Sequence, residues 1–166
     1  EPENREEYKR LVDSVQGAYD LKADFGEVAR LIIKKGTKAF DDLELQTGSP
    51  VNVMLYQKAK GLADAFERVG KPCAFEYKYD GFRIQIHKEN DKVKIYTRRL
   101  EEVTIQFPEV VRYAKHHIKT DSCIVDAECI GYDPKTGKYL PFQAISQRIR
   151  RKYDIEKMAV DFPVEI

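Results

Sequence analysis

A potential nucleophile, Lys78, lies in the run EYKYDGFR that begins at Glu76. The alternation of a strand over residues 73–79 would place Glu76, Lys78 and Asp80 on one face. A lysine amine attacks an electrophile only when it is neutral, and deprotonating it at pH 7 costs about 4 to 5 kcal/mol. Neighbouring carboxylates increase that cost because they favour the ammonium form. Lys78 therefore needs further positive charge nearby before it can serve as a nucleophile.

A second predicted strand, residues 82–88, would supply that charge. It places Arg83, Gln85 and His87 on one face, and Gly81 before it allows a tight turn or the close approach of a ligand. A guanidinium and a divalent metal would offset the carboxylates and stabilise the charge on a phosphoryl group under attack. The alternating charges alone more often mark the solvated face of an edge strand. His87 fits a structural role as well as one in a site.

The first 45 or so residues are predicted to be helical, because their apolar residues recur with helical spacing. The capping box Asp24-Phe25-Gly26-Glu27 opens a second helix, which ends near Gly36. The break at Gly48-Ser49-Pro50 and the change of pattern after it predict a domain boundary. We therefore divide the chain into residues 1–47 and residues 48–166.

Strands and short helices alternate after this boundary. The pattern indicates an α+β fold, in which a mainly antiparallel sheet carries peripheral helices. The predicted strands are residues 73–79, 82–88, 93–98 and 123–132, with a further strand beginning at Pro163. The predicted helices are residues 58–69, 108–117, 142–151 and 155–160.

The composition is that of a globular protein with one substantial core, since 42% of the 166 residues are hydrophobic. The 29 Lys and Arg nearly balance the 28 Asp and Glu, so any contact with nucleic acid must come from local patches. The sequence has no long apolar run and its polar start is unlike a signal peptide, which predicts an intracellular location. Cys73, Cys123 and Cys129 lack metal-ligand spacing and are predicted to be buried free thiols on strands.

Two local basic clusters stand out. The first, Arg148 with Arg150, Arg151 and Lys152, fits a contact with a DNA phosphate backbone and a solvated helix face equally well. The second, residues 115–119, contains adjacent histidines that point in different directions on a helix. That geometry is poor for metal binding, so we interpret these histidines as surface residues.

Several segments together resemble the ATP-dependent DNA ligases, a family of nucleotidyltransferases with a K-x-D-G motif. Lys78-Tyr79-Asp80-Gly81 fits that motif and Arg83 follows it. Other segments resemble, in order, the family's G-x-P-x-x-P-M-L, S-R-N-x-E-D, D-G-E and P-F-Q patterns, the last typical of archaeal and eukaryotic replicative ligases; these are residues 48–55, 96–104, 124–128 and 141–143. The sequence departs from these patterns at Val53, Thr97, Arg99 and Ala127.

The resemblance implies a role for individual residues. Lys78 would form the phosphoramide bond to AMP from ATP, and Glu76 would contact the adenine or orient it. Arg83 would bind phosphate, since a guanidinium fits phosphate in a bidentate manner. Arg98 and Glu128 would contact ribose, phosphate or the catalytic Mg²⁺, for which a carboxylate such as that of Glu128 is a suitable ligand. Arg99, beside Arg98, is the alternative for the role of that arginine.

The resemblance also implies a fold and a reaction. Residues 1–47 would end a helical DNA-binding domain, and residues 48–166 would begin an ATP-grasp-like adenylation domain. AMP would pass from Lys78 to the 5′-phosphate of a nick in double-stranded DNA, and the 3′-hydroxyl would then seal the strand. Such enzymes serve DNA replication, repair and recombination, in the cytoplasm of prokaryotes or the nucleus of eukaryotes. Parts of the parent protein outside this chain could contact a sliding clamp.

The family's later motifs are absent, so the sequence is interpreted as a fragment with little or no self-adenylylation. An RNA ligase or an mRNA capping nucleotidyltransferase is the alternative within the same chemistry. A DNA-binding module without catalysis is the alternative of a different class.

Overall fold

The computed structural model describes residues 2–40 and 43–166. Residues 1, 41 and 42, all within the region predicted as helical, lie outside the described part. The helices are α1 (Arg5–Lys22), α2 (Phe25–Lys35), the 3₁₀ helix η1 (Thr37–Phe40), α3 (Leu62–Val69), α4 (Pro108–His117), α5 (Phe142–Ile149) and α6 (Ile155–Asp161). The strands are β1 (Phe82–Glu89), β2 (Lys92–Thr97), β3 (Ser122–Asp133), β4 (Lys138–Leu140) and β5 (Val164–Glu165).

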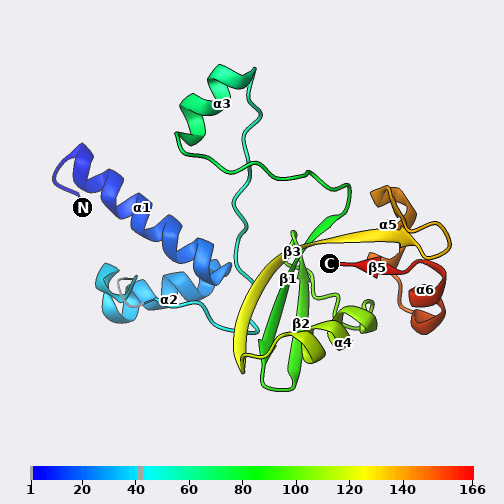
Figure 1. Ribbon diagram of the computed structural model, residues 1–166. Coiled ribbons are helices and arrows are strands. Elements are labelled where there is room, and N and C mark those ends of the chain that lie inside the picture. Colours follow the sequence, from blue (N-terminus) through cyan, green and yellow to red (C-terminus); the bar gives the residue numbers. More distant parts are fainter. Residues whose placement is uncertain (1, 41–42) are drawn as a thin grey trace.

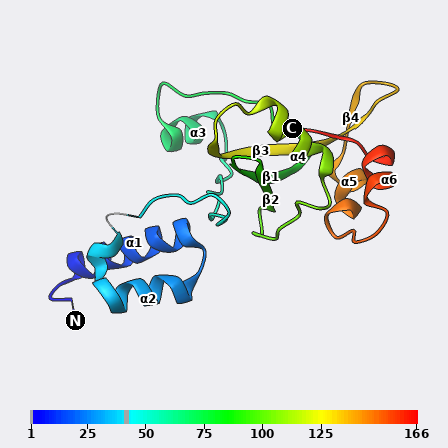
Figure 2. The same ribbon diagram turned by 90° about the horizontal axis from the view of Figure 1, so that it is seen from below.

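Helices α1 and α2 form a hairpin that lies apart from the sheet (Figure 2). The predicted cap of α2 is confirmed, because the Asp24 carboxylate accepts a hydrogen bond of 2.9 Å from the Glu27 amide. Gly36 ends this helix with a φ of 67°, which glycine adopts without steric cost. The rings of Tyr19 and Phe25 stack at 3.9 Å across the turn between the two helices.

The sheet has the order β2-β1-β3-β4, with β5 paired to β3, and every pairing is antiparallel. Together with the helices around it, this confirms the predicted α+β fold with a mainly antiparallel sheet (Figure 1). The register sets Arg83 of β1 opposite Glu128 of β3, and Gln85 opposite Tyr96 of β2. Charged and polar side chains of three strands therefore share one face.

The opposite face of the sheet carries the core. Phe82, Ile84 and Ile86 alternate with the polar residues of β1, as predicted, and they pack against buried residues of β2, β3 and α4. Pro108 occupies the first turn of α4, where the missing N–H costs nothing. Helix α4 buries Val110 and Ala114 against this face.

The predicted strand at residues 73–79 is wrong, since none of these residues lies in a strand. The segment directly precedes β1, whose two edges are occupied by β2 and β3, and it pairs with no strand of the described residues. Phe75 and Tyr77 are 78% and 89% exposed there. The alternation was real, but a strand also needs a neighbour for its backbone groups.

Smaller corrections concern helix ends and thiols. Helix α3 begins at Leu62 rather than residue 58, and α5 ends at Ile149 rather than residue 151. The three cysteines are free, and Cys129 is buried on β3, where burial raises the pKa of its thiol. Cys73 and Cys123 are only partly buried, and Cys73 also lies outside any strand, contrary to the prediction. Among the described residues, no helix is both long and apolar enough to cross a membrane.

Candidate functional site

A groove of about 900 Å³ opens beside the polar face of the sheet. Four of the five predicted site residues line it: Lys78, Arg83, Arg98 and Glu128. Its walls are residues 54–56, the turn at 97–101 after β2, and one face of α5. Glu76 is exposed and is not among the lining residues, so the structure does not bring this residue to the other four.

Arg83 is held in place by two partners. Its Nε donates to both carboxylate oxygens of Asp126, at 2.9 and 3.0 Å, and Nη2 donates to the same carboxylate. Nη1 donates to the backbone oxygen of Met54 at 2.8 Å. The hydrogen bonds to Asp126 are the main reason why the pKa of Arg83 is raised above its usual value. The guanidinium thus keeps a fixed orientation at the rim of the groove.

Glu128 is the half-buried carboxylate of the groove. Burial raises its pKa above the usual value, while the charge of Lys78 and a hydrogen bond from the Gly81 backbone lower it by smaller amounts. A carboxylate that has lost part of its hydration and faces a lysine is suited to a cation at this point. Glu128 and Lys78 are therefore electrostatically linked across the groove.

Gly81 allows the loop that carries Lys78 to approach β3. A Cβ atom at this position would collide with the backbone oxygen of Cys129 and lie 3.1 Å from Cγ of Glu128. Asp80, beside it, accepts a hydrogen bond of 3.3 Å from the amide of Phe142 at the start of α5. The loop is thereby fixed between β3 and α5.

The groove is rich in positive charge. Lys78 shares it with four arginines and two carboxylates, namely Arg83, Arg98, Arg99, Arg150, Glu101 and Glu128. Both candidates for the arginine after β2, Arg98 and Arg99, are exposed and line the groove, so its geometry does not separate them. A polyphosphate is the ligand that such a groove suits best.

A divalent cation fits Glu128, but not as a site built from protein ligands alone. Among the described residues, no group of three or more His, Cys, Asp or Glu side chains could hold a metal ion. Mg²⁺ commonly takes one or two carboxylates and completes its shell with substrate phosphates and water. A single carboxylate beside a groove that suits phosphate, as Glu128 is, has the chemistry of the protein ligand in such a shell.

Two contacts in the site were missed by the sequence analysis. Asp126 received no role, although it stands two residues before Glu128 and therefore on the same strand face. That spacing is a signal that could have indicated its position near Arg83. The Met54 contact uses a backbone oxygen, which no side-chain pattern reveals.

His87 lies outside the groove, in a buried structural position. It is 2% exposed, and its Nδ1 accepts a hydrogen bond of 3.1 Å from the Gly48 amide. Its pKa is lowered from the usual 6.5, first by burial and then by the charge of Lys94. The lowered pKa favours a neutral imidazole, and the accepting Nδ1 requires one.

We expect the chain to lose stability as the pH falls below about 6.5. In that range His87 of the unfolded chain gains a proton that the folded chain resists, so protons favour unfolding until the pH passes the lowered folded value. Thermal unfolding between about pH 5 and pH 7.5 measures the effect. His87→Asn should weaken this dependence, whereas His116→Asn, at an exposed position, should not. Equal pH dependence in both variants would contradict the interpretation.

Arg148 does not join its neighbours in a basic surface. It is fully buried, forms an ion pair with Glu109 at 2.5 Å and lies over the ring of Phe107. The cluster predicted at residues 148–152 therefore divides, because Arg150 faces the groove while Arg148 belongs to the interior.

The chain is similar to known proteins over most of its length. Residues 53–166 match the family model described as the ATP dependent DNA ligase domain. The chain is 51% identical over 154 residues to a DNA ligase of Nanoarchaeum equitans, covering 93% of the chain and 27% of that protein. It is 42% identical over 158 residues to DNA ligase 2 of Thermofilum pendens, covering 95% of the chain and 26% of that protein. The chain thus spans about a quarter of the length of these relatives.

Proposed function

Because the chain belongs to the ATP-dependent DNA ligase family, we propose that it is part of an enzyme that seals nicks in double-stranded DNA at the expense of ATP. The observation that carries the proposal is the groove in which Lys78, Arg83, Arg98 and Glu128 meet. These residues come from a loop, two strands and a turn, and the fold brings their side chains to one cavity.

Lys78 is the proposed nucleophile. Its amine attacks the α-phosphorus of ATP, a phosphoramide bond to AMP forms, and pyrophosphate leaves. Among the described residues Lys78 forms no ion pair, and it shares the groove with four arginines that are suited to the phosphates of ATP. Mg²⁺ would be held by Glu128 and would stabilise the charge that develops on the phosphates.

Arg83 is the proposed phosphate ligand. A guanidinium has five N–H donors, and Asp126 and Met54 engage three of them through Nε, Nη1 and Nη2. Two N–H groups remain for a phosphate, in an orientation that the other three determine. Asp126 and Met54 therefore position Arg83 before a nucleotide arrives.

The remaining steps belong to the whole parent protein. AMP passes from Lys78 to the 5′-phosphate of the nick, and the 3′-hydroxyl then displaces AMP to join the strand. Nicked DNA is the proposed substrate, and exposed Arg150 at the groove edge is suited to its backbone. Any contact with a sliding clamp would come from parts of the parent outside this chain.

Labelled nucleotides test the proposal directly. The full-length parent, incubated with Mg²⁺ and labelled ATP or GTP, should become labelled from ATP and should then seal a nicked DNA duplex. Labelling from GTP alone would overturn the proposal, since it would indicate a capping nucleotidyltransferase. Sealing of nicked RNA with no sealing of DNA would overturn the choice of substrate.

A further inference from the structure

The connecting segment, residues 46–56, joins the helical hairpin to the groove. It is bound to the hairpin at its beginning, where Lys22 donates to the side-chain oxygen of Gln46 at 3.1 Å. Lys22 is buried there, being only 8% exposed. The amide of Asn52 donates to the backbone oxygen of Asp20 at 2.9 Å. The end of α1 and the connecting segment are thus hydrogen-bonded to each other.

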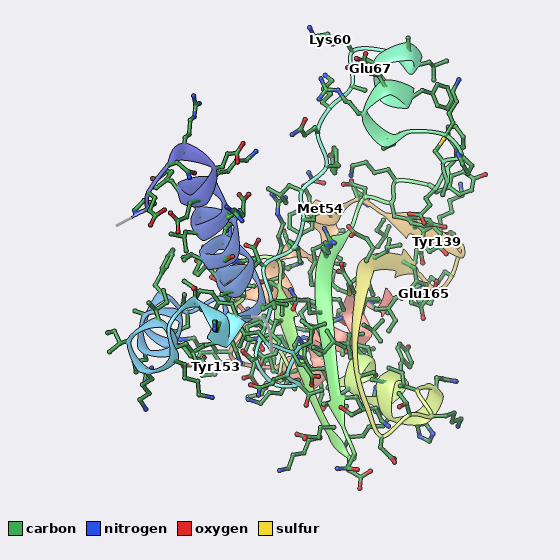
Figure 3. All side chains as sticks on the ribbon, turned by 90° about the vertical axis from the view of Figure 1, so that its left-hand side faces the viewer. Met54, Lys60, Glu67, Tyr139, Tyr153 and Glu165 are labelled. Atoms are coloured by element: carbon green, nitrogen blue, oxygen red, sulfur yellow. The ribbon has the colours of Figure 1, made fainter. Side chains whose placement is uncertain are left out.

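The same segment ends in the groove wall. Its residues 54–56 line the groove, and the backbone oxygen of Met54 accepts from Arg83. Figure 3 places Met54 near one end of the sheet, whereas Lys60 and Glu67 lie farther along the chain at α3. The connecting segment therefore touches the hairpin and the candidate phosphate ligand within eleven residues.

Between these ends, a polar cluster on the sheet holds the segment by its backbone. The Gly48 amide donates to Nδ1 of His87 at 3.1 Å, and the Gly48 oxygen accepts from the Tyr96 hydroxyl at 2.7 Å. Gln85 accepts from the Val51 amide at 3.0 Å and donates to the Val51 oxygen at 2.6 Å. The backbone N–H and C=O groups of both Gly48 and Val51 are therefore hydrogen-bonded to side chains of the sheet.

The side chains that make these contacts are buried, which raises the cost of losing the hydrogen bonds. Gln85, His87 and Tyr96 are between 2% and 4% exposed, so their polar atoms are cut off from water. Buried polar groups are costly without partners, and most partners of this polar cluster lie on the connecting segment. Moving the segment off the sheet would break these four hydrogen bonds and would leave, within the cluster, only the polar contact of 3.3 Å between His87 and Gln85. Residues 46–56 are therefore an ordered segment held on the sheet and not a flexible linker.

We propose that Gln85, His87 and Tyr96 are positioning residues, which fix the connecting segment so that the helical hairpin and the groove keep one relative placement. The inference rests on the proposed function, because the expected effect of losing this placement is weaker nucleotide binding in the groove. Loss of the polar cluster would release residues 54–56 and the partner of Arg83. Nucleotide binding would weaken, whereas the maximal rate of Lys78 adenylylation at saturating ATP would change little.

Backbone relaxation in the isolated chain tests the coupling without any catalysis. In the wild-type chain, the ¹⁵N relaxation of α1, α2 and β1 to β3 should fit one rotational correlation time. In the double variant Gln85→Met/His87→Phe, the helices should tumble separately from the sheet, and the Gly48 and Val51 amides should exchange at least about tenfold faster. Separate tumbling in the wild type would overturn the inference.

Nucleotide labelling of the full-length parent tests the consequence. The double variant should need about tenfold more ATP for half-maximal labelling, with a maximal rate within about threefold of the wild type. Restoring an acceptor with His87→Asn in place of His87→Phe should recover part of the change. Tyr96→Phe, which removes one hydroxyl and should fold normally, should raise the ATP requirement by about threefold. Tyr113→Phe is the matched control, since its hydroxyl has no hydrogen bond among the described residues.

The two proposals fail in different ways. If the variants lose maximal rate in proportion to their folded fraction while the ATP requirement stays the same, the polar cluster has only a structural role and the inference is overturned. If the wild-type parent is not labelled at all, the proposed function fails, and the relaxation measurement still decides whether the hairpin and the sheet are coupled.

Discussion

The full-length parent carrying Lys78→Ala should show no gain of AMP mass after incubation with ATP and Mg²⁺. Alanine has no nucleophile, so labelling should fall by at least about 10⁴-fold. Lys78→Arg should be equally inactive, because a guanidinium stays protonated and cannot attack a phosphate. The variants should remain folded, since Lys78 is exposed and forms no ion pair in the described part of the chain. Intact-mass measurement reads the result directly.

A matched lysine outside the groove supplies the control. Lys92 begins β2 at an exposed position and is absent from the groove lining, so Lys92→Ala should keep the AMP mass shift. A mass shift that persists in Lys78→Ala would remove Lys78 from its role. A shift lost in both variants would point to a general effect of lost positive charge.

The residues of the candidate site were predicted mainly from the resemblance to the ATP-dependent DNA ligases, whereas strand alternation predicted which residues of β1 share a face. A period of two sets Arg83, Gln85 and His87 on one face of β1, and the antiparallel register then brings Glu128 opposite Arg83. The same alternation at residues 73–79 gave a wrong strand. The difference is the availability of a neighbouring strand, which side-chain periodicity does not encode.

The contacts that orient the site were harder to predict, because they join residues far apart in sequence. Asp126 meets Arg83 from a position 43 residues away, and His87 meets the Gly48 amide from 39 residues away. The sequence did not distinguish between a structural role for His87 and a role in the site. The structure supports the structural role. Phe82 and Arg83 of β1 line the groove, whereas His87 does not and instead binds Gly48 of the connecting segment.

Arg148 is the case in which local sequence gave the least guidance. It belongs to a basic run with Arg150, Arg151 and Lys152, and chemistry alone does not distinguish these side chains. The distinction comes from Glu109 on α4, 39 residues away, which pairs with Arg148 in the interior. The position of a charge relative to the core, rather than its type, decides whether it serves binding or stability.

Arg148→Leu should therefore destabilise the chain by about 3 to 5 kcal/mol, because it leaves the Glu109 carboxylate buried without its partner. Arg148 also donates to the backbone oxygens of Phe162 and Gln106, both at 2.8 Å, so the change also frees the end of α6 and the turn before α4. Denaturant unfolding of the 166-residue chain measures the loss as a lower midpoint at unchanged slope. The effect should exceed that of any groove substitution on stability.

Two further variants separate the ion pair from simple packing. Arg150→Leu, two residues along and exposed, should change stability by no more than about 0.5 kcal/mol. The double variant Arg148→Met/Glu109→Leu should recover much of the loss, since both buried charges leave together and apolar side chains of similar size remain. If Arg148→Leu were as mild as Arg150→Leu, the buried pair would not stabilise the fold. If the double variant were no better than the single one, the backbone contacts to Phe162 and Gln106, rather than the stranded carboxylate, would account for the loss.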